Sequence, residues 1–376
     1  MSNPTVQTLL HEHLAKFAEQ HALPLYQLKA LENLSKCRTS ALGGHAQYCE
    51  NHHLAGIWYN SCRQRFCPQC RGMATEEWLL NTKRVLLDCP HHHVVFTIPS
   101  ELNIYWQHNL GTMRDLLFKA VQETLKAFSQ DVKYLNAMPG ILCALHTWGR
   151  NLCLHPHIHV LITHGGVNKR GEWVTPRRDI LFPQKPVMQV FRGKLRSYLI
   201  EAINRPDWRS PPGIRRSKTL NLLNQLGRKA WVVNFSERYE HAEGVASYLS
   251  RYIKSGPLKN YQIKYVTDTH VRFVYFSHRS KKKEAQTIPI KPFLALLAQH
   301  IPESGKPTVR YNGLYSAGGR GKLNKARTAL GQVPVSERVI LQWQAYLEDK
   351  WERPSCPICG GKLISLEEVP SERCVN

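Results

Sequence analysis

The chain has 376 residues, with 51 Lys and Arg against 28 Asp and Glu, which gives a formal net charge of +23. This length allows two or three domains. The positive excess favours a polyanionic partner such as nucleic acid, because each neutralised phosphate releases counterions. No basic segment precedes an apolar run at the N-terminus, and no stretch of about 18 apolar residues occurs, so we expect neither secretion nor a membrane span.

The eleven cysteines are therefore expected to be reduced in the cytoplasm. In that compartment clustered cysteines bind metal more often than they form disulfides. The basic residues are spread over the whole chain, so charge alone leaves a ribosome-associated or other basic protein open.

Hydrophobic periodicity and turn residues predict the elements of the first half of the chain. In order they are two amphipathic helices over 5–36, a Cys-, His- and Gly-rich segment over 37–70, a helix over 76–87, a strand over 92–98, a helix over 111–129 and strands over 141–148 and 155–163.

The same signals predict the elements of the second half. They are a loop over 173–186, a helix over 187–204, a Pro- and Arg-rich segment over 205–218, a strand over 230–235, a helix over 242–253, a hairpin over 261–267 and 270–277, a helix over 289–301, a basic Gly-rich segment over 302–331 and a helix over 337–350.

Strands interleaved irregularly with helices indicate an α+β fold with a largely antiparallel sheet. We expect three regions. Residues 1–90 form a helical and zinc-binding domain, residues 91–300 form the catalytic domain, and residues 301–376 form a basic C-terminal region.

The cysteine-rich segment has the ligand spacing of a zinc site. Cys67-Pro-Gln-Cys70 is a tight knuckle that presents two thiolates to one ion, and Cys49 and His52 have the same spacing. These four residues predict a Cys₃His site. Because the set supplies enough protein ligands to be closed, we expect a structural Zn²⁺ rather than a catalytic one.

Other cysteines and histidines remain beyond these four. Cys37, His45 and Cys62 would form most of a second zinc site whose fourth ligand stays open. A further half-knuckle lies near the C-terminus, where the candidate zinc ligands are Cys356, Cys359 and Cys374.

Histidine occupies every second position in the strand that contains His155, His157 and His159. Side chains alternate faces along a strand, so all three imidazoles can point the same way. If the preceding strand pairs with this one, His146 can complete a divalent-metal site. Pro156 costs a ladder hydrogen bond, so His155 is expected at the start of the strand.

Tyr248 and Tyr252 lie four residues apart in a predicted helix, which places both on one face. A tyrosine nucleophile forms a phosphodiester with a cleaved DNA strand and so conserves the bond energy for rejoining. Packing on the core is the better explanation of such a pair taken alone. The histidine strand upstream favours a nucleophilic role for the two tyrosines, because a cation bound there would polarise the scissile phosphate.

Basic side chains near these motifs are candidates for contacts with DNA phosphates, and exposed aromatic side chains could stack on bases. The candidate DNA-binding residues are Arg251, Lys254, Arg279, Lys281, Lys282, Lys283 and Arg320.

In this order, the motifs resemble the two-tyrosine HUH transposases of bacterial insertion sequences, of the insertion-sequence-ninety-one type, which move by rolling-circle transposition. The resemblance spans most of the chain. The segments that carry it are CRTSALGGH, YNSCRQRFCPQC, HVVFTIPSEL, LHTWGRNLCLHPHIHVLITHGG, YLSRYIKSGP, VRYNGLYS and CPICGGKL. Two positions depart from the family pattern. Phe66 stands where the family often has His, and His52 stands where it often has Cys.

The resemblance implies an antiparallel sheet with the histidine pair on a central strand and the tyrosines on a helix beside it. By this likeness His157 and His159 would bind Mg²⁺ or Mn²⁺, and Tyr248 and Tyr252 would be the nucleophiles. The spacing from His146 to His157 is similar to that of plasmid relaxases, which makes His146 the candidate third ligand. The implied partners are single-stranded or melted DNA at transposon ends and target DNA, and a homo-oligomer remains open.

Two other classes of function remain open. A plasmid relaxase or replication initiator would share the chemistry and differ in its substrate. A non-catalytic, zinc-dependent DNA-binding regulator would explain the charge and the cysteines but not the histidine strand. From the histidines alone, a metal-dependent hydrolase is a further alternative, and it would leave no covalent adduct with DNA.

Overall fold

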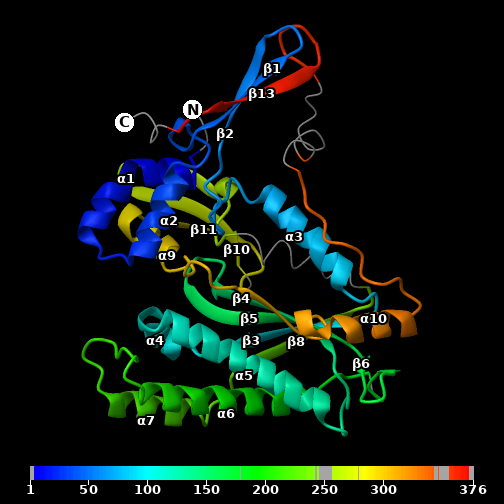
Figure 1. Ribbon diagram of the computed structural model, residues 1–376. Coiled ribbons are helices and arrows are strands. Elements are labelled where there is room, and N and C mark those ends of the chain that lie inside the picture. The colour runs from blue at the N-terminus through cyan, green and yellow to red at the C-terminus, as the bar shows by residue number, and fades with distance from the viewer. Residues whose placement is uncertain are drawn as a thin grey trace.

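The computed structural model describes residues 4–177, 179–241, 244, 256–277, 279–342, 346 and 355–371. Its centre is a five-stranded antiparallel sheet in the order β12-β4-β5-β3-β8 (Figure 1). The strands are β3 (His91–Thr97), β4 (Gly140–Trp148), β5 (Leu154–Thr163), β8 (Val232–Tyr239) and β12 (Val309–Gly313). Helices flank the sheet, which confirms the predicted α+β fold.

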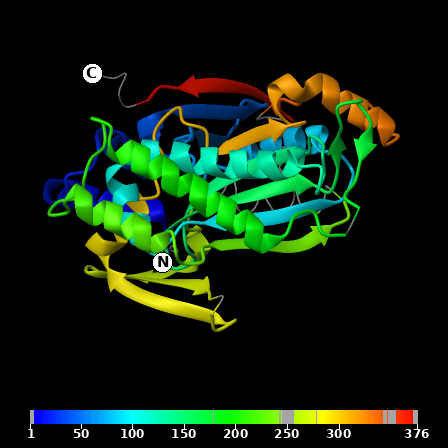
Figure 2. The same cartoon turned by 90° about the horizontal axis from the view of Figure 1, so that it is seen from below.

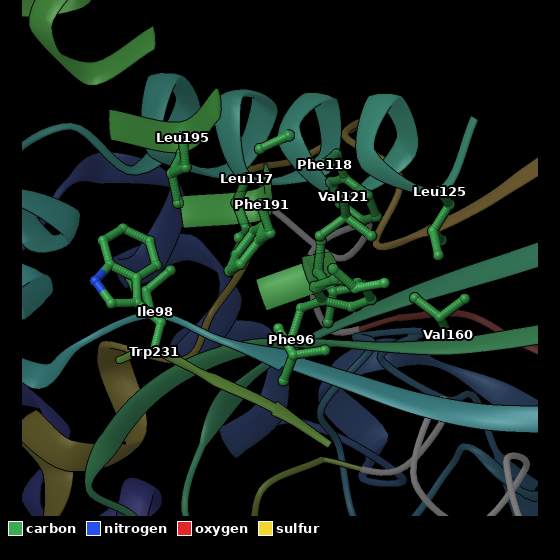
Figure 3. Close-up of a cluster of buried hydrophobic side chains, with 14 of the residues drawn as sticks. Phe96, Ile98, Leu117, Phe118, Val121, Leu125, Val160, Phe191, Leu195 and Trp231 are labelled. Carbon is green, nitrogen blue, oxygen red and sulfur yellow. The ribbon is translucent and has the colours of Figure 1, made fainter. Parts of the chain in front are cut away.

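One face of this sheet is covered by a layer of helices (Figure 2). They are α4 (Asn103–His108), α5 (Leu110–Gln130), α6 (Gln184–Ile203) and α7 (Arg216–Leu226). In α5 the buried residues Met113, Leu117, Val121 and Leu125 recur every fourth position and form one apolar stripe. This stripe packs on inward-facing strand residues, as Figure 3 shows around Phe96.

Replacing Phe96 by Ala should lower the free energy of unfolding by about 3–5 kcal/mol, because it leaves a cavity in this core. The Phe96 ring is fully buried and meets Phe191 edge-on, with ring centres 5.1 Å apart. Urea unfolding would measure the change. Val132→Ala is the control, since Val132 is 80% exposed and should change stability by no more than about 0.5 kcal/mol. A Phe96→Ala loss below about 1 kcal/mol would contradict this packing.

The opposite face of the sheet carries a smaller core, formed where the chain returns after residue 301. Leu142 and Leu161 pack there against Tyr315 and Leu323, which belong to the segment around β12 and α10 (Arg320–Ala329). β12 pairs with β4. The predicted boundary at residue 300 therefore cuts through the central sheet, because strand pairing with β4 outweighs the basic, Gly-rich composition of this segment.

A second lobe combines the start of the chain with residues far along it. Helices α1 (Val6–Gln20) and α2 (Leu25–Ser35) share one core with α9 (Ile290–Ala298) and a β11-β10-β9 sheet. These strands are β9 (Ile263–Val266), β10 (His270–Phe276) and β11 (Lys283–Pro289). The hairpin predicted over 261–277 is present, and β11 is an additional strand. Residues 258–301 thus pack with the N-terminal helices rather than only with the central sheet.

A third sheet joins the two ends of the chain and extends away from the lobes (Figure 1). Its order is β13-β1-β2, where β1 is Gly44–Cys49, β2 is Leu54–Tyr59 and β13 is Leu363–Val369. Both pairings are antiparallel, with Gly44 opposite Val369 on one side and opposite Tyr59 on the other.

Further elements lie between these sheets along the chain. α3 (Gly72–Val85) follows the cysteine-rich segment, and β6 (Gly166–Val167) pairs with β7 (Trp173–Val174). The helix predicted over 337–350 is not formed over 337–342. There the backbone bonds to α3 instead, because the Asn81 amide donates to the Val339 carbonyl at 2.7 Å and accepts its N–H at 3.1 Å. Among the described helices, none has the combined length and apolarity needed to cross a bilayer.

Candidate functional site

The histidine site lies on the face of the central sheet that the helical layer leaves free. His146 of β4 stands directly opposite His157 of β5, and His159 follows two residues later. Ile158 and Val160 point into the core under α5 and α6. The period of two in β5 therefore separates the imidazoles from the apolar side chains, as the alternation of residues in a strand requires.

The three imidazoles converge closely enough for one ion. One ring nitrogen from each of His146, His157 and His159 lies within 4.8 Å of the others. The Nε2 atoms of His157 and His159 are 3.0 Å apart. Two ligands at about 2.1 Å from a cation and at right angles to each other would be separated by about 3.0 Å. The donor set therefore fits a divalent cation with further positions open to other ligands.

Hydrogen bonds and burial prepare these rings as ligands. His157 Nδ1 lies 2.6 Å from the His155 carbonyl oxygen and donates to it, which leaves Nε2 as the free lone pair. Burial lowers the pKa of His157 to about 4 and holds the pKa of His159 well below 6.5. Both rings are therefore neutral near pH 7, and neutral imidazole is the form that binds metal.

His93 is a candidate member of this site that the sequence pattern did not reveal. Its Nε2 atom lies 2.8 Å from His159 Nδ1, and the two rings are nearly coplanar, edge to edge, with centres 5.1 Å apart. A partner on Nδ1 fixes the tautomer in which Nε2 faces a cation. Part of the signal was present in the run of three histidines at 91–93: alternation puts His91 and His93 on one face, and the register with β5 places His93 near His159. His155 is not among the converging imidazoles.

Four cysteines form a compact cluster at the base of the N-terminal lobe. The ligand atoms of Cys37, Cys62, Cys67 and Cys70 all lie within 4.8 Å of one another. The Sγ atoms of Cys37 and Cys67 are 3.6 Å apart and those of Cys62 and Cys70 are 3.7 Å apart. Sulfurs bound tetrahedrally at about 2.3 Å from zinc would be separated by about 3.8 Å. The neighbouring thiols lower the pKa of Cys70, so a thiolate is already favoured.

This arrangement corrects the predicted zinc ligand sets. Cys67 and Cys70 join Cys37 and Cys62 rather than Cys49 and His52. Cys49 lies at the far end of β1, because the β1–β2 hairpin extends away from the knuckle. It groups there with three residues that were not assigned to it, His53, Cys356 and Cys359.

His45 and His52 belong to none of the ligand clusters found among the described residues. His45 lies four residues before Cys49 in β1, so at about 3.3 Å per residue roughly 13 Å of strand separates the two. His52 is exposed and adopts a φ of 58°, and its neighbour His53 turns its ring toward Cys49 instead. Cys374 lies outside the described residues.

Comparison with known proteins adds family information to this geometry. Residues 9–98 match the family model described as "Transposase zinc-binding domain", and residues 140–322 match the one described as "Putative transposase". The protein y4qJ of Sinorhizobium fredii, also described as a "Putative transposase", is 29% identical over 380 residues, which cover 97% of this chain and 96% of that protein. The chain belongs to this transposase family.

A second relative agrees with this assignment. The transposase for insertion sequence element IS801 of Pseudomonas savastanoi pv. phaseolicola is 29% identical over 305 residues, which cover 80% of this chain and 72% of that protein. The chain is therefore a DNA-processing enzyme of the transposase class. The zinc-binding match contains the whole four-cysteine cluster, which supports a structural Zn²⁺ in this transposase.

The predicted nucleophiles of the transposase, Tyr248 and Tyr252, lie outside the described residues, as do Arg251 and Lys254. The nearest described residues with recorded contacts before and after them are His241 and Gly256. His241 Nδ1 lies 3.4 Å from the Asp88 carboxylate, beside the start of β3. Gly256 packs on the Phe66 backbone so closely that a Cβ atom there would lie 2.2 Å from the Phe66 carbonyl oxygen.

A cavity of about 320 Å³ adjoins the histidine site. The Trp148 ring forms part of its wall and also stacks on His146, with ring centres 4.8 Å apart. Gly256 lines the same cavity. The other aromatic and basic side chains around it are Phe66, Trp78, Tyr311, His300, Arg65, Arg71, Arg114 and Lys306.

The described candidates for DNA contacts fall in two places. Arg279, Lys281, Lys282 and Lys283 are exposed in and beside the turn between β10 and β11. Phe276, at the start of this turn, lies under the Arg150 guanidinium at 5.7 Å, so the basic turn adjoins the β4–β5 turn near His146. Arg320 is exposed at the start of α10, where it lies near Arg84 and Arg338.

Proposed function

We propose that this transposase cuts one strand of DNA with a tyrosine nucleophile, beside a divalent cation held by His146, His157 and His159. The convergence of these imidazoles carries the proposal. One ring nitrogen from each lies within 4.8 Å of the others, on the face of the sheet opposite α5 and α6. Bound Mg²⁺ or Mn²⁺ would polarise the scissile phosphate there and stabilise the departing 3′ oxygen.

The positions of His241 and Gly256 support Tyr248 and Tyr252 as the nucleophiles. His241 is near Asp88, before β3, at the end of the sheet where His91 pairs with Thr163. Gly256 lines the cavity with Trp148, at the end where His146 pairs with His157. The sheet face that carries His146, His157 and His159 lies between the positions of His241 and Gly256. Both tyrosines occur between His241 and Gly256 in the sequence.

The proposed chemistry conserves a phosphodiester bond. The phenol oxygen of one tyrosine bonds to phosphorus while the bond from phosphorus to the 3′ oxygen breaks. The phenol loses its proton and the leaving oxygen gains one, so a 5′-phosphotyrosine and a free 3′-OH result. The second tyrosine would serve the next strand transfer. Rolling-circle transposition needs these two products, because the 3′-OH primes replication and the phosphotyrosine stores the bond.

The substrate we propose is single-stranded or melted DNA at the transposon ends and at the target. The cavity beside His146 supports this, because aromatic faces and cationic groups together suit an unstacked nucleotide. Arg71 Nε is buried there, and it has no hydrogen-bond partner among the described residues. A base held against Trp148 would fix the neighbouring phosphate near the histidines.

Replacing Trp148 by Ala should weaken binding of single-stranded oligonucleotides by about 1–3 kcal/mol, the usual value of one base stacked on an aromatic ring. Fluorescence anisotropy without added Mg²⁺ or Mn²⁺ would measure the change apart from any effect on His146. Trp148→Phe is the matched control and should retain most of the affinity. Equal affinity of Trp148→Ala and wild type would rule out this base contact.

A nicking assay tests the whole proposal. Wild-type protein and a labelled single-stranded oligonucleotide containing a transposon end should give a cut strand and a protein–DNA adduct that survives denaturation, provided that Mn²⁺ is present. Cutting without an adduct would indicate a metal-dependent hydrolase. Binding without cutting would indicate a non-catalytic DNA-binding protein.

A further inference from the structure

We propose that Cys49, His53, Cys356 and Cys359 bind a second zinc ion, which fastens the C-terminal strand to the N-terminal zinc-binding module. One ligand atom from each residue lies within 4.8 Å of the others. Cys49 and His53 flank the β1–β2 turn, whereas Cys356 and Cys359 come from a knuckle about 300 positions later in the chain. The family match to the zinc-binding domain ends at residue 98 and contains only the first half of this site.

The distances agree with tetrahedral zinc. Cys49 Sγ lies 3.7 Å from Cys359 Sγ and 3.6 Å from His53 Nδ1. Zinc bound at about 2.3 Å to sulfur and about 2.0 Å to nitrogen would place two sulfurs about 3.8 Å apart, and a sulfur and a nitrogen about 3.5 Å apart. Three thiolates and one imidazole are a complete ligand set for structural zinc.

The backbone around the site has the features of a metal knuckle. The Ile358 N–H lies 3.4 Å from Cys356 Sγ, and the Asn51 amide lies 3.4 Å from Cys359 Sγ. Such donors stabilise thiolate charge around a metal and orient the ligands. The Cys356 N–H donates to the Gly361 carbonyl at 2.8 Å and closes the loop. Gly360 supplies the left-handed turn, with a φ of 73°.

The sheet that this site would hold has little other support. Leu54, Ile57 and Ile364 are 45%, 43% and 57% exposed. Among the described residues, none of β1, β2 or β13 belongs to any of the three hydrophobic cores. Backbone pairing alone is a weak source of stability for a small sheet. A metal that ties β13 to β1 would supply folding energy that the apolar contacts do not.

Zinc content of the full-length protein tests the proposal. His53→Asn and Cys359→Ser should each hold one zinc ion per chain fewer than wild type, whatever the three-histidine site holds, because neither variant changes that site. His52→Asn is the matched control, because Asn tolerates the left-handed backbone of His52 and this residue is not in the cluster. Cys374→Ser is a second control, and both controls should hold as much zinc as wild type. Equal zinc content in wild type and His53→Asn would overturn the site.

A measurement on the wild type avoids dependence on the folding of variants. Protein loaded with ¹¹³Cd should give one resonance from a four-sulfur site and one from a site with three sulfurs and one nitrogen, apart from any resonance of the three-histidine site. Absence of the three-sulfur, one-nitrogen resonance would overturn the proposal. In His53→Asn and Cys359→Ser, hydrogen exchange of residues 363–369 should accelerate while exchange in α1 stays unchanged. Unchanged exchange in β13 would show that the ion does not fasten this strand.

Discussion

Replacing both Tyr248 and Tyr252 by Phe should abolish the covalent protein–DNA adduct and reduce strand cutting by at least about 1,000-fold, because removal of a nucleophile eliminates the chemical step. Phe keeps the ring and removes only the oxygen that attacks phosphorus. The measurement is denaturing electrophoresis of the protein after incubation with a labelled single-stranded transposon end and Mn²⁺.

Single Tyr→Phe variants would show which tyrosine makes the first cut. If one tyrosine makes the first cut, its Phe variant alone should lose the adduct, and the other variant should cut but fail to complete strand transfer. Tyr261→Phe is the control, since this ring is 76% exposed and lies outside the proposed site. An adduct that persists in the double variant would refute the assignment of the nucleophiles.

The histidine strand shows what a local pattern can predict. His157 and His159 share a face because a strand has a period of two, and this needs no knowledge of the rest of the fold. The prediction of His146 as a third ligand required only that the two neighbouring strands pair, and a short connection between strands favours such pairing. His93 could not be found in this way, because its place beside His159 depends on the register between β3 and β5, which no local signal fixes.

The cysteines show the opposite case. Spacing identified the knuckle of Cys67 and Cys70 but paired it with Cys49, the nearest residue with a similar motif in the sequence. The structure uses Cys37 and Cys62 instead. Partner choice among half-sites depends on tertiary contacts. A useful signal was that the chain has incomplete half-sites near both ends, each lacking the ligands that the other supplies.

The segment after residue 301 was predicted least well. Its composition is basic and Gly-rich, which is typical of a surface segment, yet Val309–Gly313 forms an edge strand of the central sheet. The helical periodicity over 337–350 was likewise overridden over 337–342, where the backbone bonds to Asn81 of α3. In both segments contacts with distant residues determine the conformation, and local propensity is too weak to oppose them.

His157→Ala and His159→Ala should each abolish Mn²⁺-dependent cutting, because two remaining imidazoles cannot hold the cation against water. Binding of Mn²⁺ to the protein, measured by calorimetry, should fall in parallel. His93→Ala should have a smaller effect, about 10–100-fold in metal affinity, since its ring lies 2.8 Å from His159 Nδ1 and orients that ligand from outside the ligand set. His155→Ala is the matched control on the same strand and should cut like the wild type.

The acid side of the pH profile offers an independent check on this site. Burial lowers the pKa of His157 to about 4, so protonation competes with the cation only as the pH falls toward that value. Exposed histidines would instead lose metal near pH 6.5. We therefore expect Mn²⁺ affinity to change little between pH 8 and pH 6 and to fall below pH 5. A loss centred near pH 6.5, or full cutting by His157→Ala, would show that these imidazoles do not hold the catalytic cation.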